Sequence, residues 1–510
     1  MKWRAIHLTV AVCLVGFAGT VSAQQITTLT LEDAIEIARQ NNPNFLATQN
    51  DLGPARWNVR SATSNLFLPS ANLNFSAGWQ DEGIERVGGA TFGQPALLIS
   101  NYSFSLSYNL NGTTLFAPAQ RRAEARAVER RIEDANIQLR NNVTQAYLEV
   151  LRLQEQAEQA EREFRRTEEH LRLAEARQEV GAGTRLETMQ ADVTRGQAEV
   201  NMIVAFNQAR VAKLRLISAL GVEVSAAQAE EIELVSEFDV FQPDVDTQAL
   251  LQVALRSNPS LIAARADRDA ANSGVKTAKA SYLPTLSLRA SWVGFTREET
   301  DADALVTRAV NSAESQAAQS VQLCNTFNEL YDLSGGTPPP EFSNCSQYTF
   351  TSAEADSLAR RTRLTNDQFP FAFSNQPLSL SAFLSIPIFT GFNRQVQVEQ
   401  AITRRNDLEY QVRGLELQIT ADVTEAAHNL ETAYQTVILQ RENTARAREE
   451  LRLAQERYQL GAGTFLELLD SQTLAAQAEV DQINALYSFH QSLVALEAAV
   501  GRQLELRSSE

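Results

Sequence analysis

The phrase "VGAGTRLE" occupies residues 180–187, and "LGAGTFLE" occupies residues 460–467, 280 positions later. The similarity extends around the phrase, because residues 171–200 and 451–480 match at 15 of 30 positions. A dinucleotide-binding loop would need a preceding strand and a third glycine, and here helix-forming residues flank both copies. The repeated phrase therefore indicates a tight turn between two helices.

The repetition extends to whole halves of the chain. "ARQNNPNF" at residues 38–45 resembles "ALRSNPSL" at residues 254–261, and each Asn-Pro is followed by a Leu-Pro, at residues 68–69 and 283–284. This spacing far exceeds the period of about 20–50 residues found in solenoid repeats. It indicates duplication of a structural half. The predicted organisation is a first repeat, a linker, a second repeat and a C-terminal tail, at residues 24–221, 222–246, 247–501 and 502–510.

Four stretches alternate between apolar residues and small polar residues. We predict strands at about residues 70–79, 100–110, 285–295 and 378–388. Period-two alternation gives a sheet one apolar face, as transmembrane barrel strands require and as half-buried soluble sheets also show. Four strands cannot close a membrane barrel, since the smallest single-chain barrels have about eight. Open edges in lipid would leave backbone groups unpaired, so several copies would have to share one barrel; three copies supply twelve strands.

Long helices are predicted between the strands and the glycine turns. Residues 115–180 contain no proline after Pro118 and are rich in Ala, Glu, Gln, Arg and Leu, which favour helix. Val143, Val150 and Ala157 recur every seven residues, as in a coiled-coil seam. Some 60 residues at about 1.5 Å each make a rod of roughly 90 Å. A corresponding rod is predicted for residues 392–460.

The beginning of the chain resembles an export signal. Residues 1–23 have a basic start, an apolar run too short to span a membrane, and a small-residue end, as in a secretory signal peptide. The net charge is −17, and removal of this segment would make it more negative. Nucleic acid is therefore not an expected partner, because phosphate-binding surfaces need clustered Lys and Arg.

Residues 296–376 separate the third and fourth predicted strands and have no counterpart of this length in the first repeat. By position they should form an extracellular loop. They contain Cys324 and Cys345, whose spacing in an exported protein indicates a disulfide, with two free thiols as the alternative. The sequence shows no catalytic motif and no metal-ligand spacing of Cys and His. We therefore expect neither an enzyme nor a cofactor.

The leader, the duplicated halves, the strands and the long helices together resemble the TolC-like outer membrane efflux proteins. The most specific parts are the two "RxxxGAGTxLExxx" turns at residues 177–190 and 457–470, the Asn-Pro and Leu-Pro pairs, and "SIPIFTGFNR" at residues 385–394. The resemblance implies an α+β membrane protein. Its homotrimer would form a twelve-stranded outer-membrane β-barrel, four strands per chain, continued by an α-helical coiled-coil tunnel in the periplasm.

The resemblance also implies a function and partners. The protein would be the passive exit channel of a tripartite efflux pump or a type I secretion system, conducting small molecules or polypeptides. Its partners would be outer membrane lipid, a periplasmic adaptor, and an inner-membrane pump of the RND, ABC or MFS class. The alternative from another class is a non-transporting periplasmic coiled-coil scaffold, which would not need the strands.

Two groups of site residues follow from the resemblance. The adaptor-docking tip would comprise the turn residues Gly181, Ala182, Gly183, Thr184, Gly461, Ala462, Gly463 and Thr464. The periplasmic gate would comprise Glu467, Asp470, Glu187 and Tyr458. Glu467 and Asp470 share a helix face, so three chains would bring six carboxylates around one axis. The plainer alternative is that these acids stabilise a helix start. The best-known members carry an arginine at the position of Gly463, and Arg185 and Arg457 are the nearby cations here.

Overall fold

The computed structural model describes residues 28–223, 225–236 and 238–504. The predicted signal peptide at residues 1–23 and the end of the tail lie outside the described residues. The chain divides into two compact units. One comprises Met1–Arg56, Ala123–Ala270 and Asn406–Glu510, and the other comprises Trp57–Arg122 and Ala271–Arg405. Within the described ranges, no helix is both long enough and apolar enough to cross a membrane.

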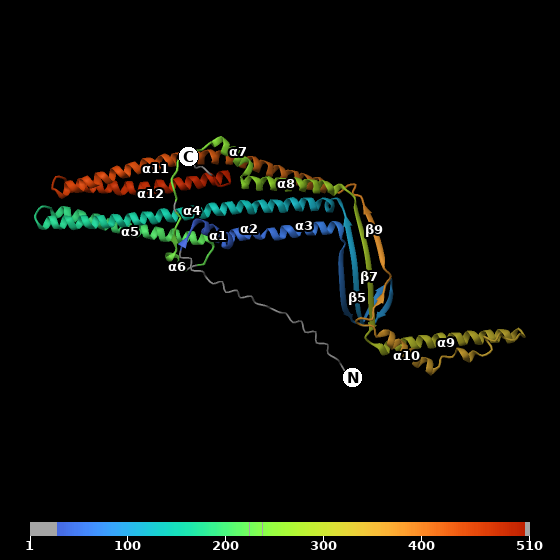
Figure 1. Ribbon diagram of the computed structural model, residues 1–510. Helices are drawn as coiled ribbons and strands as arrows, with labels where there is room; N and C mark the ends of the chain where they lie inside the picture. The colour runs from blue at the N-terminus through green and yellow to red at the C-terminus, as the bar shows by residue number, and fades with distance from the viewer. Residues whose placement is uncertain (1–27, 224, 237, 505–510) are drawn as a thin grey trace. The chain divides into compact units, whose positions relative to one another are not determined.

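The first unit is helical and is built on two long helix pairs (Figure 1). Helix α4 (Gly112–Glu179) leads through the first glycine turn to α5 (Arg185–Leu220). Helix α11 (Asn393–Gln459) leads through the second turn to α12 (Phe465–Val500). The helices of each pair pack together through buried apolar residues. Val143 of α4 and Leu216 of α5 share one cluster, and Leu451 of α11 and Leu468 of α12 share another.

Each Asn-Pro motif lies between two shorter helices, and its asparagine hydrogen-bonds to the end of a long helix. Asn42 lies between α1 (Leu31–Asn41) and α2 (Pro43–Asn50), and its side-chain amide donates to the carbonyl of Ala219 at 2.8 Å. Asn258 lies between α7 (Thr247–Ser257) and α8 (Pro259–Lys279) and donates to the carbonyl of Ala499 at 2.9 Å. The motif recurs because both halves dock their short helices in this way.

The glycines that end α5 and α12 belong to the same junctions. Gly221 and Gly501 have φ of 74° and 85°, the left-handed conformation common after a helix end. A Cβ on Gly221 would lie 2.5 Å from the carbonyl oxygen of Asn41, and one on Gly501 would lie 2.5 Å from Cδ of Pro259. Only glycine satisfies both the backbone conformation and this close approach.

The linker between the repeats packs on the first helix pair. Strand β6 (Glu233–Leu234) pairs in parallel with β1 (Thr28–Leu29), after the short helix α6 (Ala226–Glu231). The hydroxyl of the fully buried Tyr147 donates to the carbonyl of Leu29 at 2.8 Å and accepts from the amide of Ser236 at 3.2 Å. This side chain therefore connects α4 to β1 and to the segment just after β6.

The second unit contains an antiparallel sheet. Its main strands, in spatial order, are β2 (Ser70–Gln80), β5 (Leu97–Leu110), β7 (Thr285–Glu299) and β9 (Ser379–Ser385). The short β8 (Ser374–Asn375) also pairs with β7, and β3 (Gly83–Val87) forms a hairpin with β4 (Ala90–Gln94). The predicted fourth strand reached residue 388, but β9 ends at Ser385. Pro387 follows, and proline cannot donate to a strand ladder.

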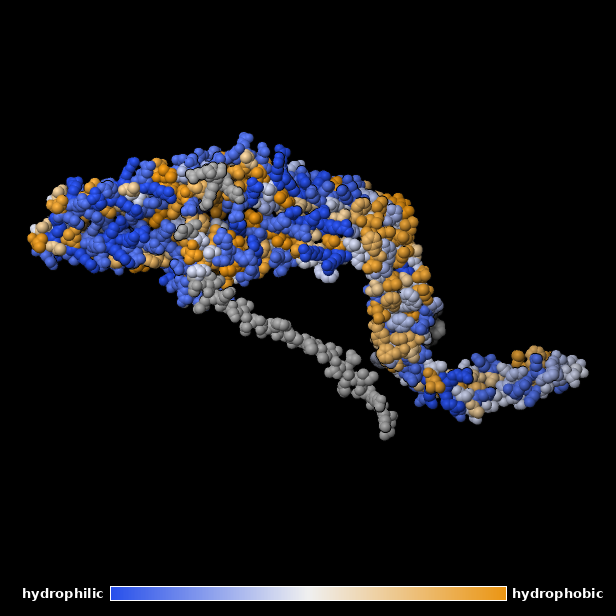
Figure 2. Space-filling model, in the orientation of Figure 1, coloured by the Kyte–Doolittle hydropathy of each residue, from blue (hydrophilic) through white to orange (hydrophobic). Residues whose placement is uncertain are grey.

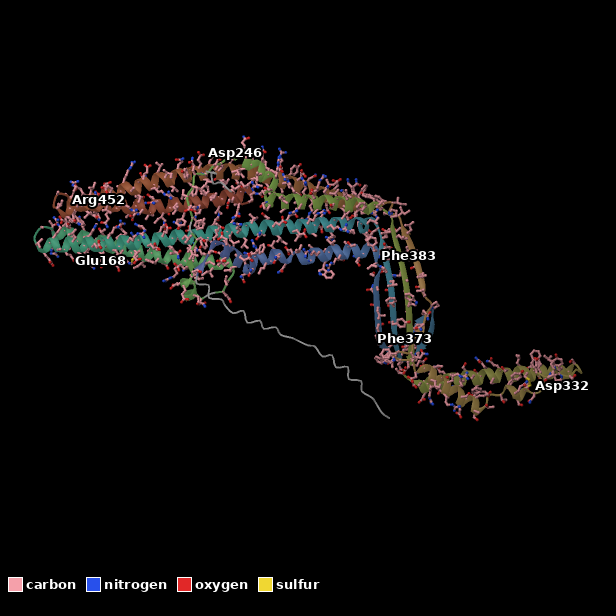
Figure 3. All side chains as sticks on the ribbon, in the orientation of Figure 1. Glu168, Asp246, Asp332, Phe373, Phe383 and Arg452 are labelled. Atoms are coloured by element: carbon pink, nitrogen blue, oxygen red, sulfur yellow. A yellow bond between two sulfur atoms is a disulfide. The ribbon has the colours of Figure 1, made fainter. Side chains whose placement is uncertain are left out.

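The register separates the two faces of the sheet. Asn72, Ser105, Ser291 and Ser379 lie in one row across the strands, on the polar face. The neighbouring row, with Leu73, Phe104 and Trp292, lies on the apolar face. Figure 2 shows apolar side chains gathered over these strands. Phe373, labelled in Figure 3, packs edge-on against Tyr102 of β5 with ring centres 4.8 Å apart.

Residues 296–376, which we predicted from their position to be an extracellular loop between two strands, contain helices. Strand β7 continues to Glu299, and two helices follow, α9 (Ala302–Leu333) and α10 (Ser352–Asn366). The cause is local, because α9 contains neither Pro nor Gly and Asp301 caps it by accepting from the amide of Ala304 at 2.8 Å. A disulfide between Cys324 and Cys345 ties α9 to the one-turn helix that begins at Cys345.

Candidate functional site

The two glycine turns have the same backbone geometry. The carbonyl of Arg177 accepts from the amides of Ala182 and Gly183 at 2.8 and 3.0 Å. In the second turn the carbonyl of Arg457 accepts from the corresponding amides at 2.8 and 3.1 Å. Gly181 and Gly461 have φ of 76° and 75°, a left-handed conformation that favours glycine. The first glycine of each phrase is therefore set by backbone conformation.

The second glycine of each phrase lies where there is little room for a Cβ atom. A Cβ on Gly183 would lie 3.1 Å from Cβ of Arg177, and one on Gly463 would lie 3.2 Å from Cβ of Arg457. The arginine four residues before each turn thus packs directly on it. The backbone conformation and these contacts account for both glycines of each copy without any ligand.

The threonine and glutamate of each phrase form a capping box. The amide of Glu187 donates to Oγ1 of Thr184 at 3.2 Å, and the amide of Thr184 donates back to the Glu187 carboxylate at 3.5 Å. Thr464 and Glu467 make the same two contacts at 3.2 and 3.3 Å. Each box satisfies amides that a helix start leaves unpaired. Thr-x-x-Glu is visible in the sequence, so this role could have been found there.

Around the second turn, one of the two predicted gate acids lies beside a cation. The carboxylate of Glu467 is 3.6 Å from the guanidinium of Arg457. Asp470 is exposed one turn further along α12 and lines an open groove of about 990 Å³ together with Glu467 and Arg457. Arg457 therefore supplies positive charge next to Gly463, which carries none.

The other two predicted gate residues come from opposite halves of the chain. Tyr458 is buried, and its ring lies 4.6 Å below the guanidinium carbon of Arg177. Arg177 also donates to the carbonyl of Tyr458 at 2.7 Å. Burial raises the pKa of Tyr458, the Glu187 carboxylate raises it further, and Arg177 opposes them. The structure thus brings Glu187 and Tyr458 together and joins the two helix pairs near their turns.

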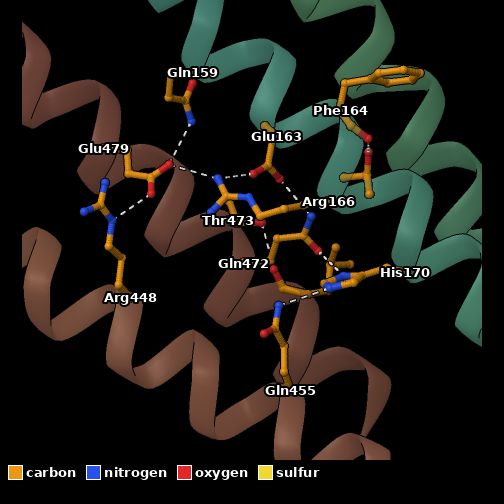
Figure 4. Close-up of polar contacts among 12 residues, drawn as sticks. Gln159, Glu163, Phe164, Arg166, His170, Arg448, Gln455, Gln472, Thr473 and Glu479 are labelled. Carbon is orange, nitrogen blue, oxygen red and sulfur yellow. Dashed lines mark hydrogen bonds and ion pairs between the residues drawn. The ribbon is translucent and has the colours of Figure 1, made fainter.

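Farther along the helices lies a buried charged cluster that sequence reasoning missed (Figure 4). The carboxylate of Glu479 on α12 accepts from Arg166 of α4 and from Arg448 of α11, both at 2.9 Å. Gln159 of α4 donates to it at 3.4 Å. Burial works against the charged carboxylate, but the two arginines hold the pKa of Glu479 below its ordinary value. Glu479 therefore connects three helices as an anion.

The cluster continues along α4 and α12. Arg166 pairs with Glu163 at 2.6 Å, and Gln472 donates to Glu163 at 2.8 Å. The other amide atom of Gln472, its oxygen, lies 2.9 Å from Nδ1 of His170. Burial lowers the pKa of His170, while the hydrogen bond with Gln472 partly opposes this shift. The ion pair between Arg166 and Glu163 is thus continued by the neutral side chains of Gln472 and His170, which hydrogen-bond between α4 and α12.

Across the described ranges, no three His, Cys, Asp or Glu side chains gather so that they could hold a metal ion. The residues form two long helix pairs, each closed by a tight turn and joined to the other by polar contacts, and a separate sheet with an apolar face. Long paired helices and an open sheet with one apolar face are the elements that the sequence predicted for an outer membrane channel.

Comparison with known proteins gives the family. The family described as outer membrane efflux protein matches residues 34–222 and 354–502. The chain belongs to this family. Among similar relatives, the pyoverdine export outer membrane protein OpmQ of Pseudomonas aeruginosa is 23% identical over 467 residues, which cover 89% of this chain and 83% of that protein. The outer membrane efflux protein BepC of Brucella suis is 23% identical over 395 residues, covering 76% and 70%.

Solved structures show the same fold. The outer membrane protein VceC of Vibrio cholerae has a TM-score of 0.64 at 18% identity, with 93% of this chain and 97% of that chain covered. The CmeC outer membrane channel of Campylobacter jejuni has a TM-score of 0.68 at 15% identity, covering 92% and 85%. The predicted family and the predicted α+β class are confirmed. The protein is an outer membrane efflux channel, and it is not an enzyme.

Proposed function

We propose that the chain acts as a homotrimer in which three four-stranded sheets close one twelve-stranded barrel. The observation that carries this proposal is the open sheet. Strands β2 and β9 each have one side without a partner strand among the described residues, and Leu73, Phe75 and Trp79 on the apolar face are all more than half exposed. Unpaired backbone groups in lipid cost several kcal/mol each, so the edges must meet other edges.

The helical unit supports the same assembly. Helix α5 carries an exposed apolar stripe with spacings of three, four and seven residues: Leu186, Met189, Val193, Val200 and Ile203. A stripe of this period is a coiled-coil seam without its partner helix. In the trimer a helix of the neighbouring copy covers it, and the long helices form a tunnel through the periplasm. The channel is passive, and an inner-membrane pump of the RND, ABC or MFS class supplies the energy for cargo that is a small molecule or a polypeptide.

The glycine turns are the periplasmic ends of this tunnel in our proposal. Ala182 and Ala462 are exposed at the apices, where the hairpin of a periplasmic adaptor docks. Glu467 and Asp470 of three copies face one axis and form an acidic ring, with Glu187 and Tyr458 holding neighbouring helix pairs closed. Like charges at short range repel, so the ring needs cations, from Arg457 or from a partner, to stay closed.

Cell fractionation tests the assembly. We expect the protein in the outer membrane, migrating at trimer size without heating and at monomer size after boiling. A soluble periplasmic monomer would favour the scaffold alternative and contradict the channel.

Export assays test the docking tip. Ala462→Trp keeps both turn glycines, so the turn should form and trimers should remain in the membrane while export is lost. The matched control is Leu474→Trp, at an exposed position two turns further along α12. Full export by Ala462→Trp would contradict the assignment of the turn to the docking site.

Channel recordings test the gate. Glu467→Gln combined with Asp470→Asn removes the negative charge of the ring, so it should change the ion selectivity in planar bilayers and weaken block by divalent cations. If neither quantity changes, the acidic ring is not the gate.

A further inference from the structure

The polar face of the sheet carries three charged side chains, all on β7: Arg289 in the first half of the strand, and Arg297 and Glu299 at its other end. The other positions on this face of β2, β5, β7 and β9 are mostly Ser and Asn. We propose that Arg289 determines ion selectivity inside the barrel and favours anionic solutes, those bearing carboxylate, phosphate or sulfate groups. This inference rests on the proposed trimeric barrel, whose polar face lines the lumen.

The register gives Arg289 an unobstructed position. It lies between Ser107 of β5 and Ser381 of β9, and Ser107 is paired in turn with Ser70 of β2. Its row across the sheet is therefore Ser, Ser, Arg and Ser. The Ser70 and Ser107 hydroxyls hydrogen-bond to each other at 2.7 Å and stay close to the strands. Arg289 is the one long side chain in the row, and it is exposed.

Arg289 has no nearby counter-charge within the sheet. Among the described side chains, none forms an ion pair or hydrogen bond with its guanidinium. The only acids on the four strands are Glu298 and Glu299, at the other end of β7. Nine residues of strand at about 3.3 Å each place them roughly 30 Å away. At physiological salt, charges are screened over about 8 Å, so these acids do not neutralise Arg289.

Threefold repetition turns this residue into a ring. Three guanidiniums at one level, always protonated, surround the same lumen. Rings of Arg or Lys favour anions in pores, as rings of Asp or Glu favour cations. A guanidinium also matches carboxylate and phosphate oxygens in a two-pronged geometry. The channel then has a cation-favouring ring at the tip, from Glu467 and Asp470, and an anion-favouring ring in the barrel.

Reversal potentials in planar bilayers test the proposal. With a KCl gradient across the purified protein, Arg289→Ser should lower the chloride-to-potassium permeability ratio about threefold near 0.1 M salt, and by less near 1 M because screening is stronger. Arg289→Lys keeps the charge and should retain the wild-type ratio. For Arg289→Cys, a cationic thiol reagent should restore the ratio. An unchanged ratio in Arg289→Ser at both salt concentrations would overturn the proposal, as would an equal loss in Arg289→Lys.

The same measurements separate this inference from the proposed function. If the wild-type protein forms neither trimers nor conducting channels, the trimeric barrel is wrong and the inference falls with it. If all variants conduct with one selectivity, only the role of Arg289 is wrong. Should Arg289→Ser fail to assemble, Ser381→Asp replaces it, since an aspartate paired with Arg289 neutralises the charge and should shift the ratio in the same direction.

Discussion

Replacement of Glu479 by alanine should destabilise the helical unit far more than the same change at Glu199. The two glutamates stand 280 residues apart at equivalent positions in the repeats, in "QAEV" on α5 and α12. The Glu479 side chain is 9% exposed and pairs with Arg166 and Arg448 at 2.9 Å. The Glu199 side chain is 43% exposed, and its nearest cation, Arg195, lies at 3.5 Å.

The different burial of the two glutamates determines how much stability each substitution should cost. Removing one partner of a fully buried ion pair costs about 3–5 kcal/mol. Here Arg166 retains Glu163 at 2.6 Å, and Arg448, with a side chain 59% exposed, can return to water. We therefore expect a loss of about 2–3 kcal/mol for Glu479→Ala, between the buried and exposed cases. For Glu199→Ala we expect about 0.5 kcal/mol or less, as for exposed pairs.

Thermal unfolding of the purified protein in detergent, followed by helical circular dichroism, measures both variants. Glu479→Ala should unfold several degrees below wild type and Glu199→Ala within about a degree, since a large protein shifts by roughly 2 °C per kcal/mol. The pKa of Glu479 is lowered in the folded state, so its contribution is present above the unfolded-state pKa and is lost as the pH falls through the folded-state value. The gap between wild type and Glu479→Ala should thus narrow in acid. Equal shifts for the two alanine variants would refute the reasoning.

Three further predictions concern other parts of the chain. Gly461→Ala should destabilise the second turn by roughly 1–2 kcal/mol, because its φ is 75°, and should speed hydrogen exchange at the turn; Gly461→Asn, which tolerates that conformation better, should cost less. Burial lowers the pKa of His490 to about 4, so the folded state favours the neutral imidazole. The free energy of unfolding should therefore fall by about 2 kcal/mol between pH 7.5 and pH 5. His490→Phe should abolish this pH dependence in unfolding scans. Cys324→Ser with Cys345→Ser removes a cross-link over 21 residues, worth about 3 kcal/mol, and should expose α9 to protease without dissociating the proposed trimer.

Features that depend on neighbours in sequence could be predicted. The turns follow from glycine conformation and Thr-x-x-Glu capping within eight residues, and the strands from alternation of side chains on a pleated backbone. The helices within residues 296–376 are also local in origin. We predicted an extracellular loop there from the position of the segment between two strands, and position alone does not indicate helix, although α9 has no Pro or Gly.

The cluster at Glu479 could not be predicted, because its partners Arg166 and Arg448 lie 313 and 31 residues away. Spacing of this kind has no periodic signature. The same holds for Tyr458, whose contact with Arg177 depends on how the two helix pairs meet. Arg289 is an intermediate case. Alternation places it on the polar face, but only the register shows that its neighbours in the row are serines.

The two repeats share a turn and differ in what surrounds it, and this difference bears on assembly. Helix α12 lies against both α4 and α11, so its glutamate is buried between arginines of each, and most of its apolar positions are buried, with Leu466 and Leu474 exposed. Helix α5 packs on α4 but leaves Leu186, Val193 and Ile203 exposed. The duplication gives the chain two equivalent helix surfaces, on α5 and on α12. Within a single chain, only the surface of α12 packs against two other long helices. In the trimer that we propose, neighbouring copies would cover the exposed stripe on α5 and pair with the open edges of the sheet.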